Sequence, residues 1–441
     1  MRSERIWGGS GMSFKNTDIG LIPSEWDFDT IGDSLYIKGR IGWKGLKKSE
    51  YVDRSDYRII NGSNIVNNNI DWSGCGYISE ERYEESPEIM LKPNDIVMTK
   101  DGTIGKLAII RSLEQKTTVA SGLFVIRVED NSIDVDYLYY YFSSFYFKEL
   151  IKSRIEGSVI PHLYQKDLVA LKLPLPDLSE QKAISKILRT LDDKIEVNNQ
   201  INKTLENMAQ TIFKQWFVDF EFPNEDGEPY KSSGGEMIES ELGMIPKGWE
   251  VGSIYSIADI IYGAPFSSKL FNEDGEGLPL IRIRDLKLGN PQFYTTEEHK
   301  KGTIIIPGDI LIGMDAEFRP TIWSGKKAYL NQRVCQIKSN KDYIHDYYLY
   351  ELIKPHMQFF EFSKVGTTVI HLGKSDIDSI KVIIPNTNYL ESFSNIVAPL
   401  HDKLVSLSIE NRKLRKIRDI LLPKLMSGEI RVPLDEEGNA S

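Results

Sequence analysis

The strongest constraint on this chain is that its sequence repeats itself over a long distance. "GLIPSEW", which begins at Gly20, returns as "GMIPKGW" from Gly243. Further along, "EGSVIPHL" faces "VGTTVIHL", so that His162 matches His371 at an offset of 209 positions, and "LPLPDL" faces "VIIPNT" at the same offset. The period is much longer than that of solenoid repeats, and so many matches in one order indicate duplication of a whole domain.

Each copy of the repeat is followed by a stretch with the hydrophobic period of a coiled coil. Mostly apolar residues recur at alternating steps of four and three from Ile184 to Trp216, which is the 3.5-residue period of a coiled-coil seam. Adding 209 gives nearly the same seam further along the chain. Asn202 and Asn411 occupy equivalent seam positions, and a lone polar residue there commonly fixes the register at a cost in stability.

We therefore predict a mixed α/β (α+β) fold with pseudo-twofold internal symmetry, in which two long helices form an antiparallel coiled coil between two similar domains. Short apolar runs such as "DIVMT" and "DILIG" between turn residues predict short strands. Pro399 and Pro423 lie inside the second helical run, where a proline can kink or end a helix. The predicted segments are a tail (1–17), a first domain (18–176), a central helix (177–222), a linker (223–241), a second domain (242–386), a distal helix (387–428) and a tail (429–441).

The composition is that of a globular protein without general affinity for nucleic acid. Of the 441 residues, 41% are hydrophobic, and the net charge is −10, so any contact with DNA would depend on a local patch. No apolar run reaches the roughly 18 residues of a membrane span, and the first residues lack the apolar stretch of a signal peptide. Only Cys75 and Cys335 are present, which disfavours a disulfide framework and predicts a cytoplasmic protein.

Two domains on two helices form an arrangement that could recognise a split target. The seam from Ile184 to Trp216 spans on the order of 50 Å at 1.5 Å per residue. This length corresponds to roughly 15 base pairs of duplex DNA. A rigid bar with a reading domain at each end would recognise two half-sites with a fixed gap, as dimeric repressors do.

Three phrases carry a resemblance to a known family. They are the stretch from "LPLPDLSEQKAISKILRTLDDKIEVNNQ" to "FKQWFVDFEFP", the phrase "GEPYKSSGGEMIESELGMIPKGWE" and the closing "LRKIRDILLPKLMSGEIRV". Over essentially the whole chain after the N-terminal tail, the sequence resembles the specificity subunit of type I restriction–modification systems. The resemblance implies two target-recognition domains, each reading one half of a bipartite site in double-stranded DNA. It also implies that the helices dock two methylation subunits carrying S-adenosylmethionine, and that restriction/motor subunits using ATP and magnesium join the complex.

Motifs for chemistry are missing from the sequence. It has no Asn/Asp-Pro-Pro-Tyr/Phe motif of amino-methyltransferases and no helicase phosphate loop, since "TKDGTIGK" has the wrong glycine spacing. "PDLSEQK" imitates a nuclease signature, but its acidic groups lie where the long helix starts and suit N-capping. The histidines lack zinc-like spacing. We predict a non-catalytic chain that holds no cofactor or metal of its own.

The candidate DNA-binding residues lie in loops that carry basic, hydroxyl or acidic side chains. Lysine and arginine suit phosphates or guanine edges, an acidic group accepts from cytosine N4, and a small hydroxyl-rich turn lets the backbone approach phosphate. In the first domain the candidates are Lys38, Arg40, Lys44, Lys47, Lys100, Asp101, Thr103, Ser158 and His162. In the second domain they are Lys269, Arg282, Arg284, Asp315, Glu317, Arg319, Arg333, Thr367, Thr368 and His371.

Each candidate group also has a purely structural interpretation. "KGRIGWKGLKKSE" could be a solvated loop, "TKDGTIGK" a turn between strands, and "IRIRDLK", expected to be a strand with one basic face, could supply structural ion pairs. The hydroxyl residues of the repeated loops could cap helices, with His162 and His371 satisfied structurally. The aromatic run "DYLYYYFSSFYF" and the pair Trp216 and Phe217 are expected to pack rather than to stack on bases.

Two alternatives of other classes stay open. A coiled-coil scaffold that binds only proteins would need no paired reading domains. A self-contained restriction–modification enzyme would need nuclease or methyltransferase motifs in this chain, although the chain could also be the recognition part of another such enzyme. Sequence-selective, salt-sensitive DNA binding in the presence of methylation partners separates the scaffold from the recognition subunit.

Overall fold

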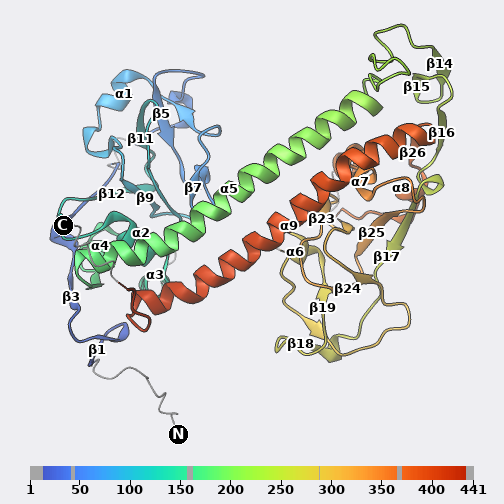
Figure 1. The fold of residues 1–441 in the computed structure, drawn as a ribbon. Coiled ribbons are helices and arrows are strands. Elements are labelled where there is room, and N and C mark those ends of the chain that lie inside the picture. The colour runs from blue at the N-terminus through green and yellow to red at the C-terminus, as the bar shows by residue number, and fades with distance from the viewer. Residues whose placement is uncertain (1–12, 41–44, 156–161, 288, 365–369, 434–441) are drawn as a thin grey trace, which may run out of the picture. The chain divides into compact units, whose positions relative to one another are not determined.

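The computed structural model of the protein describes residues 13–40, 45–155, 162–287, 289–364 and 370–433. The chain divides into two compact units, one formed by residues 1–193 together with 414–441, and the other by residues 194–413. Each unit contains one copy of the repeat and a part of each long helix (Figure 1). No helix within the described ranges combines the length and the apolar character needed to cross a membrane.

The first unit is built on a four-stranded antiparallel sheet with the order β10-β9-β12-β4. A second sheet, β11-β5-β8, contains the parallel pair β5 and β11. The elements before the first long helix are β1 (Phe14–Thr17), β2 (Gly20–Pro23), β3 (Asp27–Thr30), β4 (Leu35–Gly39), β5 (Tyr57–Ile60), β6 (Ile65–Val66), β7 (Asn69–Ile70), β8 (Gly76–Tyr77), α1 (Glu80–Glu84), β9 (Ile96–Thr99), β10 (Leu107–Ile109), β11 (Lys116–Val119), β12 (Leu123–Val128), α2 (Val135–Ser143), α3 (Phe145–Ile155), α4 (Gln165–Val169) and β13 (Lys172–Leu175).

The second unit repeats the order of the four-stranded sheet and the parallel pair of the second sheet, but this second sheet has five strands, β18-β20-β19-β24-β21, instead of three. Its antiparallel sheet has the order β23-β22-β25-β17, and its second sheet again contains a parallel pair, β19 and β24. Its elements are β14 (Met237–Ser240), β15 (Gly243–Pro246), β16 (Glu250–Ser253), β17 (Ala258–Tyr262), β18 (Phe271–Asn272), β19 (Leu278–Ile281), α6 (Ile283–Leu286), β20 (Tyr294–Thr295), β21 (Ile304–Ile305), β22 (Ile310–Gly313), β23 (Pro320–Ile322), β24 (Ala328–Leu330), β25 (Val334–Ser339), α7 (Asp346–Ser363), α8 (Lys374–Asp378) and β26 (Lys381–Ile384). The predicted duplication and the mixed α/β class are confirmed, including the strands at "DIVMT" and "DILIG".

The aromatic run of the first unit forms core, as predicted. Tyr137, Tyr141 and Phe142 of α2 are at most 2% exposed. The Tyr137 hydroxyl donates to the carbonyl of Pro174 at 2.8 Å, which satisfies the polar end of a buried ring. Phe145, at the start of α3, is the exception and is 61% exposed.

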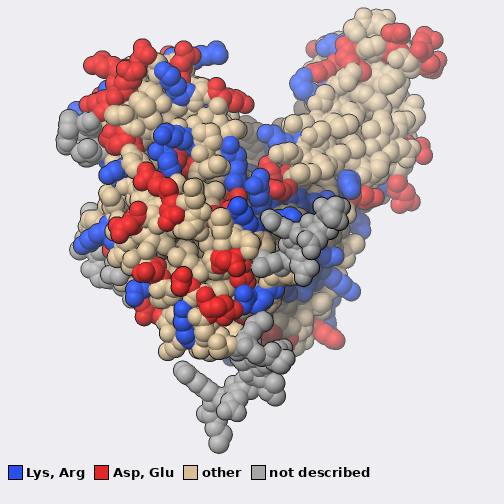
Figure 2. Space-filling view, turned by 60° about the vertical axis from the view of Figure 1, so that its left-hand side comes forward, with Lys and Arg blue, Asp and Glu red and all other residues tan. Residues whose placement is uncertain are grey.

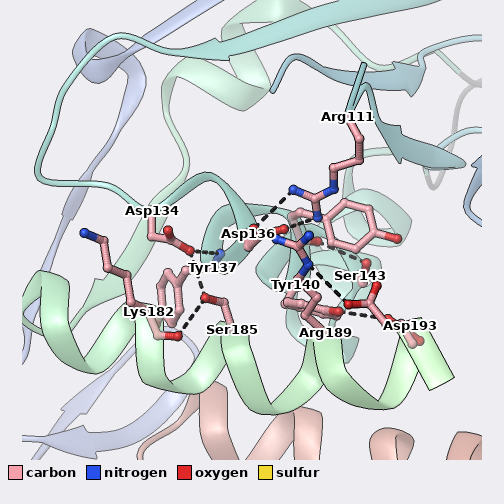
Figure 3. A network of polar contacts seen from close by, with 12 residues as sticks. Arg111, Asp134, Asp136, Tyr137, Tyr140, Ser143, Lys182, Ser185, Arg189 and Asp193 are labelled. Carbon is pink, nitrogen blue, oxygen red and sulfur yellow. Dashed lines mark hydrogen bonds and ion pairs between the residues drawn. The ribbon is translucent and has the colours of Figure 1, made fainter. Parts of the chain in front are cut away.

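Polar contacts fix α2 against the first long helix, α5 (Leu178–Phe217), within the first unit (Figure 3). Asp134 caps α2 by accepting from the backbone N–H of Tyr137 at 2.9 Å, and it also accepts from the Ser185 hydroxyl of α5 at 2.9 Å. Asp136 pairs with Arg111 and, at 3.5 Å, with Arg189 of α5. Helix α2 is therefore held in a defined orientation on α5.

The second long helix, α9 (Thr387–Met426), pairs with α5 inside each unit. In the first unit, Leu188 of α5 belongs to one buried cluster with Leu425 of α9. In the second unit, Phe213 of α5 and Phe393 of α9 belong to another, with ring centroids 6.0 Å apart. Earlier residues of α5 thus meet later residues of α9, so the pairing is antiparallel. The helix continues through Pro399 and Pro423, so neither proline ends it.

A cluster of asparagines interrupts the apolar seam in the second unit. Asn198 is fully buried and donates from Nδ2 to Oδ1 of Asn411 at 2.9 Å, and Asn411 donates to Oδ1 of Asn199 at 2.9 Å. Asn202 instead donates to the hydroxyl of Ser408 at 3.2 Å. The prediction of polar seam positions is confirmed, but the two sequence-equivalent asparagines do not bond to each other.

The repeated Pro-Trp motif packs against helix ends in both units. In the first unit, Trp26 is 1% exposed and donates from Nε1 to Glu180 at the start of α5 at 3.0 Å. The Arg431 guanidinium, just beyond α9, bonds to the same carboxylate at 2.6 and 2.9 Å. In the second unit, Trp249 stacks on Phe222, just beyond α5, with centroids 4.9 Å apart. In both units, the tryptophan of the repeated Pro-Trp motif packs at the end of a long helix. This shared contact accounts for the motif occurring once in each domain.

The segment predicted to be a linker is folded onto the second unit. Strand β14 pairs with β15 in an antiparallel hairpin. Tyr230 stacks on Phe222 at 4.6 Å and donates its hydroxyl to the carbonyl of Glu236 at 2.8 Å. Two aromatic rings therefore anchor the segment that was predicted to be a linker (223–241).

Candidate functional site

In each unit the same two loops meet at the end of an inner strand of the four-stranded sheet, β9 or β22. The loop that follows β9 and the loop before α4 are joined by a hydrogen bond from the Leu163 N–H to the carbonyl of Lys100 at 3.0 Å. The loops after β22 and before α8 are joined by the equivalent bond, from the Leu372 N–H to the carbonyl of Met314 at 2.8 Å. The duplicated His-Leu pairs, His162–Leu163 and His371–Leu372, therefore occupy the same structural position.

An aspartate–histidine pair closes each of these loop junctions. Nδ1 of His162 contacts Oδ1 of Asp101, and Nδ1 of His371 contacts Oδ1 of Asp315. Each pair also forms an isolated antiparallel bridge between the two loops. The side chains are partly accessible, at 47% and 30% in the first pair and 29% and 46% in the second. Four of the predicted residues are thus brought together in two equivalent pairs.

The hydrogen bonds determine the protonation of His371. Nη1 of Arg333 lies 3.0 Å from Nε2 of His371. A guanidinium only donates, so Nε2 must accept, and the remaining proton of a neutral ring is on Nδ1, where it is donated to Asp315. Arg333 itself has a backbone φ of 71°, a left-handed conformation that costs roughly 1–2 kcal/mol for a residue with a Cβ.

The first unit surrounds its pair with different neighbours. The ring of His162 meets the ring of Tyr164 edge-on at 4.5 Å, and Tyr164 is 55% exposed. Nζ of Lys100 lies 5.1 Å from the centre of the Phe124 ring. Tyr164 was not among the predicted residues, and its place directly after "PHL" was the signal that could have identified it.

Most of the other predicted residues that the structure describes are exposed and so are compatible with contact to a ligand. Arg319 is strongly exposed, with 77% of its side chain accessible and Glu361 3.9 Å away. The remaining exposed candidates are Lys38, Lys47, Thr103, Lys269, Arg284 and Glu317. Lys44, Ser158, Thr367 and Thr368 lie outside the described residues.

Two expectations in this set need correction, the accessibility of Arg40 and the strand around Arg282. Arg40 is 2% exposed and donates to the carbonyl of Val119 at 3.3 Å and to the Ser86 hydroxyl at 3.4 Å. Burial lowers the pKa of its guanidinium, and the side chain is part of the core rather than a DNA contact.

"IRIRDLK" is not a strand with a basic face, because β19 ends at Ile281 and a helical turn, α6, begins at Ile283. Arg282 pairs with the buried carboxylate of Asp285 at 3.0 Å and lies 4.3 Å from the centre of the Phe293 ring. It stabilises this turn, as its structural interpretation proposed.

The surface gives no sign of a metal centre or of a uniformly basic face. Within the described residues, no group of three or more His, Cys, Asp or Glu side chains is placed to hold a metal ion. Acidic and basic side chains are interspersed on the face shown in Figure 2. The two loop junctions are therefore considered as local candidates for contact with DNA.

The comparisons with known proteins all indicate the same family. The family described as "Type I restriction modification DNA specificity domain" matches residues 23–207 and again residues 246–413. The MjaIX specificity subunit of a type I restriction enzyme from Methanocaldococcus jannaschii is 30% identical over 435 residues, which cover 95% of this chain and 96% of the relative. The HindI specificity subunit from Haemophilus influenzae is 27% identical over 345 residues, covering 65% of this chain and 74% of the relative.

A solved structure shares the fold. The type I restriction–modification S subunit from M. genitalium aligns with a TM-score of 0.57 and 16% identity over 91% of this chain and 96% of that chain. The two family matches coincide with the two copies of the repeat and their helices. The chain belongs to the family of type I restriction–modification DNA-specificity proteins.

Proposed function

We propose that the chain is the DNA-recognition subunit of a type I restriction–modification complex. Each domain reads one half of a bipartite site, and the α5–α9 pair sets the gap between the halves. At 1.5 Å per residue, a 40-residue helix is about 60 Å long, or roughly 18 base pairs of duplex. The observation that carries the proposal is the duplication of a whole loop junction, with its Asp–His pair, in two domains that share one helix pair.

The proposed docking of two methylation subunits is supported by exposed apolar residues that recur at the repeat offset. Ile187 of α5 and Ile396 of α9 are 37% and 39% exposed. Met208 and Ile417 are 48% and 46% exposed. The first unit contains Ile187 and Ile417, and the second contains Ile396 and Met208. Each unit thus presents one isoleucine-containing pair, which we call the helix patch, suited to one copy of the same partner.

The chain contributes recognition in this proposal, and its partners contribute the chemistry. S-adenosylmethionine is expected on the methylation subunits, and ATP and magnesium on the restriction/motor subunits. The two cysteines are free and buried, as suits a protein of the cytoplasm, and burial raises the pKa of the Cys335 thiol to about 12, which makes it unreactive.

The test is sequence-selective binding by the chain assembled with its methylation partners. Methylome sequencing of cells that carry the system should give one motif with two specified halves and a fixed unspecified gap. Binding of purified complex to that motif should fall steeply with salt and exceed binding to scrambled DNA. Complex that binds all sequences alike would contradict the proposal and favour the scaffold.

A further inference from the structure

The two loop junctions differ at one position that faces the Asp–His pair. The N–H of Lys100 donates to the carbonyl of Gly122 at 2.9 Å, and the N–H of Met314 donates to the carbonyl of Arg333 at 2.9 Å. Gly122 and Arg333 are therefore structural equivalents, each one residue before the inner strand β12 or β25. A Cβ at Gly122 would have its nearest neighbour, Cβ of Asp101, at 3.8 Å, so the first domain has room for a side chain there.

In the second domain this position supplies a guanidinium that is fixed on one side and open on the other. Nη1 of Arg333 bonds to Nε2 of His371 at 3.0 Å, and its Nε lies 3.9 Å from Oδ2 of Asp315. The side chain is nevertheless 57% exposed. The backbone conformation at Arg333 is one that glycine adopts more easily. The arginine at this position therefore carries a local conformational cost.

We infer that Arg333 is a specificity-determining residue that reads a guanine edge in the second half-site, and that His371 and Asp315 act as positioning residues for it. The inference rests on the proposed function of the chain. Arginine contacts guanine through two acceptors, O6 and N7, and such a contact requires a defined orientation of the guanidinium plane. A phosphate contact carries no sequence information, and it can form without the fixed orientation that His371 and Asp315 give the guanidinium.

The first domain provides the natural comparison. It has the same Asp101–His162 pair but a glycine in place of the guanidinium. Among the described residues, no side chain forms a hydrogen bond with Nε2 of His162. The equivalent Nε2 of His371 accepts a hydrogen bond from Arg333. The two half-sites are therefore expected to be read by different chemistry at this position.

The experiment uses the chain assembled with its methylation subunits and a DNA library in which both half-sites are randomised. Arg333→Gly reproduces the first domain and suits the backbone, so the apparent Tm should stay the same or rise. Selection for guanine at one position of the second half-site should fall roughly tenfold. Base preferences in the first half-site should not change. Arg333→Lys, which keeps the charge without the planar fork, should lose the same preference but keep most of the affinity.

Other outcomes would overturn the inference. If Arg333→Gly weakens binding equally for every sequence, Arg333 contacts phosphate, and if binding and preference are both unchanged, it contacts no DNA. For the positioning residues, Asp315→Ala should reduce the same guanine preference, and Asp315→Asn, which keeps an oxygen to accept from His371, should preserve it. Equal effects of the two changes would exclude positioning. A wild-type complex without any base preference would defeat the proposed function itself.

Discussion

Asn198 donates a hydrogen bond from its side chain to Asn411 at 2.9 Å, and this bond joins α5 to α9 where both residues are at most 2% exposed. Burying two amides in an apolar seam costs stability unless they bond to each other. Only one alignment of the two helices satisfies the pair. The bond therefore favours one register of the two helices within the second unit.

The asparagine pair gives a stability prediction. Asn411→Leu leaves Asn198 without its buried acceptor and should lower the free energy of unfolding by about 1–3 kcal/mol. Replacing both residues by leucine should cost less than the single change, because no polar group is left unsatisfied. Thermal unfolding of the single and double variants measures both effects. A double variant less stable than either single variant would show that the pair itself contributes net stability.

The helix pair also predicts a change in the recognised gap. Inserting one heptad into both α5 and α9, at matched positions beyond the asparagine cluster, should lengthen the pair by about 10 Å. The preferred gap should then grow by roughly 3 base pairs. Selection from a library with varied gap lengths measures it, with a heptad inserted into the tail after residue 433 as control. An unchanged gap would count against the helices as a ruler.

The helix patches are the surfaces that we expect the methylation subunits to bind. Ile396→Asp and Ile417→Asp place a charge in the patch of the second and of the first unit, at positions 39% and 46% exposed. Each should reduce binding of one methylation subunit without lowering the Tm, and the double variant should bind neither. Native mass spectrometry of the assembled complex counts the subunits. Val218→Asp, at a position away from the patch that is 55% exposed, is the control.

Arg319 and Arg282 were both predicted from the sequence to contact DNA, but replacing them should have different effects. Arg319→Ala removes an open side chain and should weaken DNA binding, reduce the salt dependence by about one phosphate contact and leave the Tm unchanged. Arg282→Ala strips the partner from Asp285, which is 5% exposed, and should cost about 1–3 kcal/mol of stability. Fluorescence titration and thermal unfolding of both variants separate the roles. A Tm loss in Arg319→Ala, or weakened DNA binding in a folded Arg282→Ala, would reverse the assignment.

The contrast between these arginines shows what the sequence could and could not predict. Duplication and the heptad seam were readable because both are patterns along the chain, and Leu188 and Phe393 are buried where the period placed them. The Asp–His pairs join residues 61 and 56 positions apart, and a local pattern cannot reveal that they touch. From the sequence, Arg40 and Arg282 were expected to be accessible for contact with DNA. Their partners inside the protein can be identified only from the folded structure.

His401 should make the second unit sensitive to acid. Its ring is 6% exposed on α9, donates from Nε2 to the carbonyl of Gly308 at 3.2 Å, faces the ring of His345 at 5.0 Å and has Asp402 3.9 Å away. Burial, followed by the nearby His345, lowers the pKa of His401 to about 4, below the ordinary value near 6.5. Between these values the unfolded chain binds more protons than the folded chain, so stability falls as the pH falls.

This group should remove about 2 kcal/mol of stability between pH 7 and pH 5. His401→Gln does not titrate, and its amide can still donate to Gly308, so the variant should lose that part of the pH dependence while remaining folded at pH 7. Unfolding in denaturant at pH 7, 6 and 5 measures the difference between the two proteins. Parallel pH profiles for wild type and His401→Gln would contradict the prediction, because the acid sensitivity would then belong to other groups.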